Sequence, residues 1–153
     1  GCTAMSYAVR DLHVPLIEQL IQANASVDCL CPGPALSSKT ALMYAVERGN
    51  LDVVTMLLKG NQGDATLNRE DNQGCTAMSY AVRDLHVPLI EQLIQANASV
   101  DCLCPGPALS SKTALMYAVE RGNLDVVTML LKGNQGDATL NREDNQGCTA
   151  MSY

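Results

Sequence analysis

The chain has 153 residues, 47% of them hydrophobic, which is enough apolar material for a substantial core. Its 16 Asp and Glu against 10 Lys and Arg give a formal charge of −6 at pH 7, and such an acidic chain repels phosphate, which argues against nucleic acid as a partner. No apolar run of about 18 residues and no leader-like segment occurs, so neither a membrane span nor a secretory signal is predicted.

The most informative feature of the sequence is a perfect tandem repeat. Residues 1–73 recur without a substitution as residues 74–146, and residues 147–153 repeat the start of the unit once more. We therefore expect one continuous solenoid, with a first unit at 1–73, an identical second unit at 74–146 and the start of a third at 147–153. The lack of an initial Met and the early stop of the third copy indicate a segment of a longer array.

Each unit consists of two related halves, which we call the odd module and the even module. Residues 3–9 of the odd module align with residues 40–46 of the even module, and residues 16–21 align with residues 53–58. The aligned threonines are alternately 37 and 36 residues apart along the chain. This spacing suits two short helices and a connecting loop in every module.

In the odd module, the signals for a helix lie between residues 15 and 24. Pro15 suits the first turn, because its missing N–H would have no partner there, and the apolar residues between 16 and 21 form an inward stripe. Asn24 is expected to end the helix in a left-handed conformation. Residues 28–39 are rich in Gly, Pro and Ser and predict a loop or hairpin turn.

In the even module, Thr40 predicts an N-cap for a first helix that runs to about Arg48. Gly49 can take the left-handed conformation that ends it. A second helix is expected over residues 51–59, with Lys59 near its negative end. The segment 60–75 is again predicted to be a loop or hairpin turn.

Both modules carry one common pattern. The odd module fits it through residues 71–82, 86, 89–90, 93–94, 97–98 and 100–101, and the even module through residues 40–42, 44–46, 49–50, 53–54, 57–58, 63, 65 and 67–68. The pattern resembles the ankyrin repeats, whose module reads D-x-x-G-x-T-P-L-H-x-A-A-x-x-G-H-x-x-[IV]-V-x-x-L-L-x-x-G-A-x-V-N over about 33 residues. The resemblance covers the whole chain and implies an all-α, ankyrin-like solenoid of stacked helix-turn-helix modules with hairpin loops.

The sequence departs from this family pattern at several positions. Ala replaces the family's Pro throughout, and Ser6 or Met43 replaces its first His. Leu12 stands where the family has Gly between the helices, so we expect a strained left-handed leucine there. Extra residues around 31–34 and 60–62 lengthen two loops in alternation, which explains why the true period is 73.

No group of residues indicates catalysis or a cofactor. His13 is the only histidine of each unit, and we expect it to start a helix and to hydrogen-bond to the turn. Cys29 and Cys31, together with Cys75, offer thiolates, but their spacing does not fit a four-ligand zinc site. We therefore expect no enzymatic activity, no cofactor and no metal, and reduced thiols in a cytoplasmic setting.

The resemblance implies a partner-binding surface on the hairpin tips and on the exposed side of the first helices. Carried over residue by residue, these positions are Lys39, Glu47, Arg48, Asn72, Gln73, Cys75, Arg83 and Asp84, with Lys112, Glu120 and Arg121 as further copies. They mix both signs of charge and hold no aromatic anchor, so a solvated face is the alternative. Tyr7 and Tyr44 fall at the inward position of the first helices and are expected in the core, where each hydroxyl needs a partner.

The first functional hypothesis is structural. A segment of a long solenoid or filament would act as a fibre, spacer or spring, and its partner would be itself, through identical units packed end to end with an axial advance of roughly 20 Å per unit. The residues predicted at the end faces are Leu16, Leu20, Met56, Leu57, Met129 and Leu130. The alternative is a multivalent scaffold for a repetitive or multivalent protein. An engineered array built from one double module predicts the same structure and no natural partner.

Overall fold

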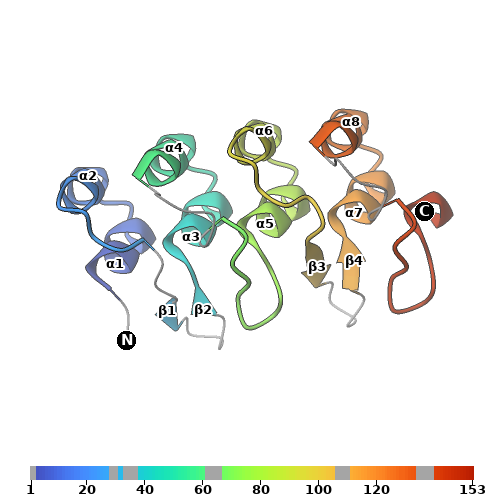
Figure 1. The fold of residues 1–153 in the computed structure, drawn as a ribbon, viewed down its shortest axis with the longest axis horizontal. Coiled ribbons are helices and arrows are strands. Elements are labelled where there is room, and N and C mark those ends of the chain that lie inside the picture. The colour runs from blue at the N-terminus through green and yellow to red at the C-terminus, as the bar shows by residue number, and fades with distance from the viewer. Residues whose placement is uncertain (1–2, 28–30, 33–37, 61–66, 106–110, 134–139) are drawn as a thin grey trace.

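The computed structural model describes residues 3–27, 31–32, 38–60, 67–105, 111–133 and 140–153. In this part of the chain, helices form two layers that run along one axis, with the two ends of the chain at opposite ends of the stack (Figure 1). The first helices of the modules are α1 (Ala4–Arg10), α3 (Ala41–Glu47), α5 (Ala77–Arg83) and α7 (Ala114–Glu120). The second helices are α2 (Val14–Gln22), α4 (Leu51–Gly60), α6 (Val87–Gln95) and α8 (Leu124–Gly133).

Short antiparallel hairpins project from the layer of first helices, on the side away from the second helices (Figure 1). Strand β1 (Cys31–Pro32) pairs with β2 (Ser38–Lys39), and β3 (Leu103–Pro105) pairs with β4 (Ser111–Thr113). The seven-residue tail ends in a 3-10 helix, η1 (Ala150–Ser152), which packs against α7. The predicted solenoid with hairpin loops is confirmed.

The first helices start where the sequence predicts. Thr40 is the N-cap of α3, and its Oγ1 accepts a hydrogen bond of 3.2 Å from the Met43 backbone N–H. The Met43 sulfur in turn accepts from the Thr40 N–H at 3.3 Å, and in α5 the Ser79 hydroxyl oxygen does the same for the Thr76 N–H at 3.1 Å. The residues that replace the family's first His therefore complete a reciprocal cap.

The turns between the helices require left-handed backbone. Gly49 has φ of +67°, and Asn24 has φ of +56° after the end of α2, as expected for C-caps. Leu12 and its copy Leu85 adopt φ of +54° and +53°, so the predicted strain at the family's Gly position is present in both units. Helix α4 continues one residue beyond the predicted end at Lys59, and the lengthened loops around 33–34 and 61–62 lie outside the described residues.

The core is continuous from one module to the next. It consists of apolar side chains on the facing sides of both helix layers, such as Met43, Val54, Met78 and Ile90, all less than 1% exposed. Burial of each such side chain contributes about 1.5–3 kcal/mol. Among the described residues, every helix is too short or too polar to cross a membrane.

Candidate functional site

The first and the second unit contact each other through side chains that recur in every unit. Here the even module α3–α4 packs against the odd module α5–α6. Gln92 Nε2 donates a hydrogen bond of 2.8 Å to Thr55 Oγ1, and the Ser99 backbone N–H donates one of 2.7 Å to Asn68 Oδ1. We call this surface the unit junction, because the same residues recur every 73 positions.

A polar and aromatic cluster lies at the unit junction, at the base of the hairpins. Lys39 Nζ lies 4.5 Å from the centre of the Tyr80 ring and 2.5 Å from Glu47 Oε1. The Arg83 guanidinium carbon also lies 4.9 Å from the same ring centre, and Arg83 Nη2 is 3.9 Å from Glu47 Oε1. Tyr80 is thus contacted by two cations, one from each unit, which Glu47 balances.

The Tyr80 hydroxyl donates a hydrogen bond of 2.6 Å to Asp71 Oδ2. The other oxygen of Asp71, Oδ1, accepts from the backbone N–H groups of Gln73 and Cys75 at 2.8 and 3.0 Å, so this carboxylate also holds the hairpin turn. Asp71 is buried, and its three hydrogen bonds stabilise the charge there. We call Lys39, Glu47, Asp71, Tyr80 and Arg83 the junction cluster.

Burial raises the pKa of the Tyr80 hydroxyl well above its usual range, and the hydrogen bond to Asp71 adds to the effect. Burial, and secondarily the charge of Asp71, raises the pKa of the Cys75 thiol to about 11. Cys75 is therefore protonated at neutral pH and behaves as an inert structural thiol. The hydrogen bond to Asp84 raises the pKa of Arg83.

The tail of the chain repeats the junction cluster on the second unit. The Tyr153 hydroxyl donates to Asp144 Oδ2 at 2.6 Å, and Lys112 Nζ lies 4.2 Å from the centre of the Tyr153 ring. Lys112 Nζ also lies 2.8 Å from Glu120 Oε1. The hydrogen bond from Tyr153 lowers the pKa of Asp144, and the same bond raises the pKa of Tyr153. Residues 147–153 therefore pack against α7 in the same way as residues 74–80 pack against α3.

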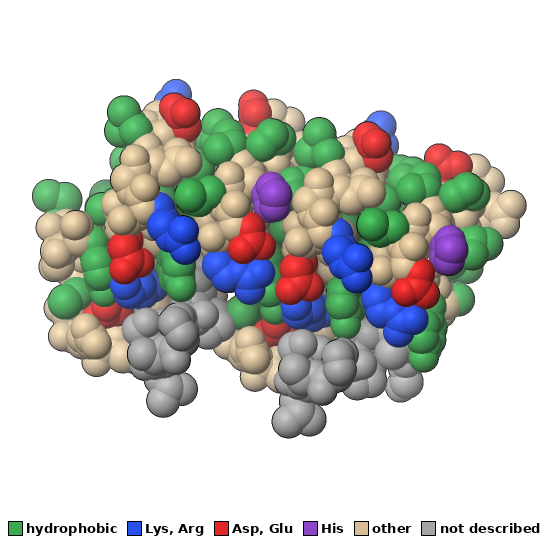
Figure 2. All heavy atoms as spheres, turned by 180° about the vertical axis from the view of Figure 1, so that it is seen from behind, with side chains coloured by type: hydrophobic (Ala, Val, Ile, Leu, Met, Phe, Trp, Pro, Cys, Tyr) green, Lys and Arg blue, Asp and Glu red, His purple; other side chains and the backbone are tan. Residues whose placement is uncertain are grey.

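The structure separates the predicted partner-binding residues into two groups. Lys39, Glu47, Cys75 and Arg83 are buried or ion-paired at the unit junction, Asp84 pairs with the adjacent Arg83, and Lys112 pairs with Glu120 at the copy of this surface beside the tail. Exposed positions on the first helices and hairpin tips are Arg48, Asn72, Gln73 and Arg121. Figure 2 shows acidic and basic side chains side by side in a band along one face of the solenoid, which matches the mixed charge of this surface.

Of the two tyrosines expected in the core, Tyr44 is half-buried and Tyr7 is 49% exposed at the end of the described stack, so Tyr7 does not occupy a core position here. Their second-unit copies, Tyr117 and Tyr80, are buried at 9% and 3% exposure. The sequence predicts that the tyrosine hydroxyl needs a partner but does not identify it. In the structure the partner of the Tyr80 hydroxyl is Asp71. The sequence signal for this contact is a spacing of nine residues between the aspartate and the tyrosine, which occurs at Asp71 and Tyr80 and again at Asp144 and Tyr153.

The open face of the first module is the uncovered copy of the unit junction. Leu16 is 50% exposed while its copy Leu89 is 2% exposed, and Leu20 is half-buried while Leu93 is fully buried. A groove of about 490 Å³ lies on this face, and its lining includes Tyr7, Leu16, Gln19 and Leu20. Leu16 and Leu20 are therefore accessible on this face, and their role in end-to-end packing stays a prediction.

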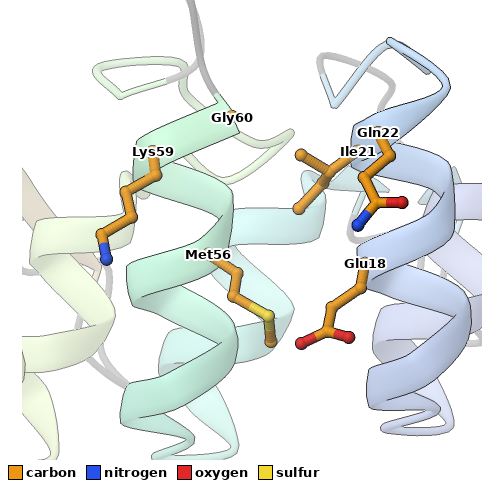
Figure 3. Close-up of a pocket in the computed structure, with 6 residues that line it drawn as sticks. All are labelled: Glu18, Ile21, Gln22, Met56, Lys59 and Gly60. Atoms are coloured by element: carbon orange, nitrogen blue, oxygen red, sulfur yellow. The ribbon is translucent and has the colours of Figure 1, made fainter.

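The opposite face, on α7 and α8, requires a correction. Leu57 and Leu130 are both 2% exposed, so they belong to the interior of their own module and not to an end face. Met56 lines a groove of about 360 Å³ between α2 and α4, inside the unit, and its copy Met129 is half-buried in the same way (Figure 3). The leucines that this end exposes are Leu124 at 75% and Leu131 at 42%.

The groove between α2 and α4 is shallow and mixed in character. Met56, Ile21 and Gly60 give it an apolar floor, Glu18 and Gln22 border it, and Lys59 points away from it (Figure 3). A Cβ on Gly60 would lie 2.8 Å from Ile21 Cγ2, so glycine permits the close approach of the two helices.

The histidines do not form the expected hydrogen bond. His13 and His86 are the N-caps of α2 and α6, and neither ring makes a capping hydrogen bond. The His86 ring instead lies against Gly49 at the unit junction, where a Cβ on that glycine would be 3.2 Å from His86 Cε1. Among the described residues, no three His, Cys, Asp or Glu side chains are grouped as metal ligands. The Cys29 and Cys31 thiols lie outside the described residues and side chains.

Comparison with known proteins gives a consistent result. The family model described as "Ankyrin repeats (3 copies)" matches residues 5–104 and 86–153. Ankyrin repeat and SAM domain-containing protein 6 of Mus musculus is 30% identical over 110 residues, and Inversin of Gallus gallus is 31% identical over 113 residues, each covering 72% of this chain. The probable E3 ubiquitin-protein ligase XBOS33 of Oryza sativa subsp. japonica is 28% identical over 135 residues, or 86% of this chain. The matches span 12%, 10% and 24% of the lengths of these relatives.

Proposed function

Because the chain belongs to the ankyrin repeat family, we propose that it is a non-enzymatic segment of a structural solenoid in which identical 73-residue units stack on one another. Such an array serves as a fibre, spacer or spring. The stacking units of this solenoid begin at residues 1, 74 and 147 in the proposal.

One observation carries it. The unit junction buries Tyr80, Leu89 and Leu93, while the first-unit copies of the same residues are half-buried or exposed. On the other side, Leu124 and Leu131 are more exposed than their first-unit copies Leu51 and Leu58. Every unit carries both sides of the contact that is formed inside the chain, and a head-to-tail contact of this kind extends into a filament.

Electron microscopy of the chain at increasing concentration tests the proposal. Filaments with an axial repeat of roughly 20 Å are expected, because each unit contains two helix pairs and packed helices lie about 8–10 Å apart. The variant L16E places a charge in the open groove at a side chain that is half exposed in the single chain, so it should abolish filaments and leave the helix content unchanged. Separate single rods at every concentration would refute stacking.

The second candidate is a multivalent protein-binding scaffold, since ankyrin repeats generally mediate protein–protein interaction. The exposed side chains of Arg48, Asn72, Gln73 and Arg121 support it, because they belong to a polar surface that recurs in the sequence once per unit. A double variant R48E/R121E should then lose binding of a protein partner while its melting temperature stays unchanged. The cytoplasmic setting stays a prediction for either function.

A further inference from the structure

Charged side chains occupy the turns between the first and the second helices in a regular order. Every first helix ends on one charged residue, and its C-cap carries a charge of the opposite sign. Figure 2 shows a band of acidic and basic side chains along one face of the solenoid. We call the last helical residues the helix-end row and the C-caps the cap row. The helix-end row is Arg10, Glu47, Arg83 and Glu120, and the cap row is Asp11, Arg48, Asp84 and Arg121.

The sign of the charge alternates along each row. The helix-end row reads basic, acidic, basic, acidic, and the cap row reads the reverse, so the two rows form a checkerboard. The contacts inside the chain follow it, because Arg83 Nη2 lies 3.9 Å from Glu47 Oε1 of the preceding module and 2.9 Å from Asp84 Oδ2 of its own. The pattern recurs in every 73-residue unit, so it continues through an array of any number of units.

The checkerboard is neutral although the chain is acidic. Its four arginines balance its four carboxylates, whereas the whole chain carries a charge of −6. The excess negative charge therefore lies on other surfaces, and two copies can approach through this face without net repulsion. The cap row is also accessible, since all four of its residues are exposed, in the interior modules as well as in the outer ones.

One cation of the checkerboard in each unit has no ion-pair partner in the described part of the chain. Arg10 and Arg83 each donate two hydrogen bonds to the adjacent aspartate at 2.9–3.1 Å. Among the described residues, Arg48 and its copy Arg121 form no ion pair. The carboxylate of Asp84 pairs with Arg83 alone within the same residues, and it has lone pairs for a second donor.

We propose that the checkerboard face binds the same face of a second copy of this chain, side by side and antiparallel, with Arg48 of one copy on Asp84 of the other and Arg121 on Asp11. This contact goes beyond the proposed stacking function, because it joins solenoids laterally and involves no end face. A single exposed ion pair contributes little, so the contact strengthens with the number of units that lie side by side. The partner it selects is another array of the same sequence.

Two-fold symmetry determines the direction of the pair. An axis perpendicular to the solenoid sets every odd module against an even module, and each residue of a row then faces the opposite sign in the same row of the partner. Arg48 thereby meets Asp84, which holds one cation. In a parallel pair, Arg48 would instead face Glu47, whose charge Lys39 and Arg83 already balance. The antiparallel pair therefore gives the unpaired cations the carboxylates that can accept them.

Exchange of the cap residues between modules tests the contact. R48D/R121D makes the cap row entirely acidic, and D11R/D84R makes it entirely basic. Each variant places at a C-cap the residue that the other kind of module has there, so the melting temperature should change little. In sedimentation equilibrium at about 0.05 M salt, each variant alone should associate at least about tenfold more weakly than the unsubstituted chain, because like charges face one another.

A mixture of the two variants gives the diagnostic result. In the antiparallel pair an entirely acidic cap row faces an entirely basic one, so the equimolar mixture should associate at least as strongly as the unsubstituted chain. In a parallel pair the cap row faces the helix-end row, and the mixture would stay as weak as each variant alone.

Salt and a matched control complete the test. Raising the salt to about 0.5 M should weaken association of the unsubstituted chain by about tenfold, because the facing charges are screened. The control R69D/R142D changes the net charge as much as R48D/R121D does, at exposed residues that precede α5 and η1. It should keep the association, since these residues lie at the opposite ends of the first helices.

The lateral contact and the proposed stacking can fail separately. A mixture that does not restore association, or an R48D/R121D chain that associates as strongly as the unsubstituted one, would overturn the lateral contact. Single-width filaments whose formation is independent of these charges would do the same and leave stacking in place. Association that depends on the cap row without any filaments would support the lateral contact and refute stacking.

Discussion

The hydrogen bond between Tyr80 and Asp71 offers a direct test of how the units hold together. The substitution Y80F keeps the ring under Lys39 and removes only the hydroxyl, which leaves Asp71 Oδ2 buried without its 2.6 Å donor. A hydrogen bond to a charged group contributes about 1.5–3 kcal/mol. We therefore expect the free energy of unfolding to fall by about 2 kcal/mol and the melting temperature by about 4–8 °C.

The repeat supplies two matched controls for this measurement. Tyr153 makes the same 2.6 Å bond to Asp144 but is 41% exposed, so Y153F should cost less than about 1 kcal/mol. Tyr7 is 49% exposed, and Y7F should change stability by less than about 0.5 kcal/mol. Urea titrations followed by circular dichroism measure all three. Equal losses for Y80F and Y7F would refute the assignment of this bond as a junction contact.

Three further predictions use the same repeat as an internal control. Gly49 and Gly122 both have φ near +65°, but only Gly49 faces His86, so G49A should destabilise the chain by about 1 kcal/mol more than G122A in thermal melts. Because burial raises the pKa of Cys75 to about 11, the unfolded chain loses this thiol proton at a lower pH than the folded chain does. The free energy of unfolding should therefore be unaffected below pH of about 8.5 and fall by about 2 kcal/mol as the pH rises towards 11, and C75A should lose this fall. T76A removes the N-cap of α5 and should cost about 1 kcal/mol in urea titrations.

Most of the fold could be predicted from the sequence because its signals are local. A threonine that caps a helix, a glycine that ends one and an apolar stripe between them act within a few residues, and Thr40, Gly49 and the helix α4 all lie where these signals place them. The strain at Leu12 could be predicted for the same reason, since the conformation of a turn depends on its own length and neighbours.

The unit junction could not be predicted in this way. The contact of Lys39 with Tyr80 joins residues 41 positions apart, and it exists only once two modules are stacked. The misplaced end-face residues have a related cause. The helical period shows that Met56 and Leu57 point inward, but it does not show whether they face their own module, the module before or the module after. The burial of Leu130 resolves this, because in the described structure Leu130 is covered without a complete third unit beside it.

The contact between two units differs from the contact between the two modules inside a unit. This difference explains why the sequence repeats as identical pairs of modules and not as identical single modules. Between units, Lys39 lies over Tyr80, whereas inside a unit the Ser79 hydroxyl donates to the Leu103 carbonyl at 2.8 Å. Loss or gain of one module would place two odd or two even modules together and leave one of these contacts without its partner. Loss or gain of 73 residues restores every contact unchanged. The physical unit of this solenoid is therefore the pair, and its length can vary in steps of a pair without a new interface.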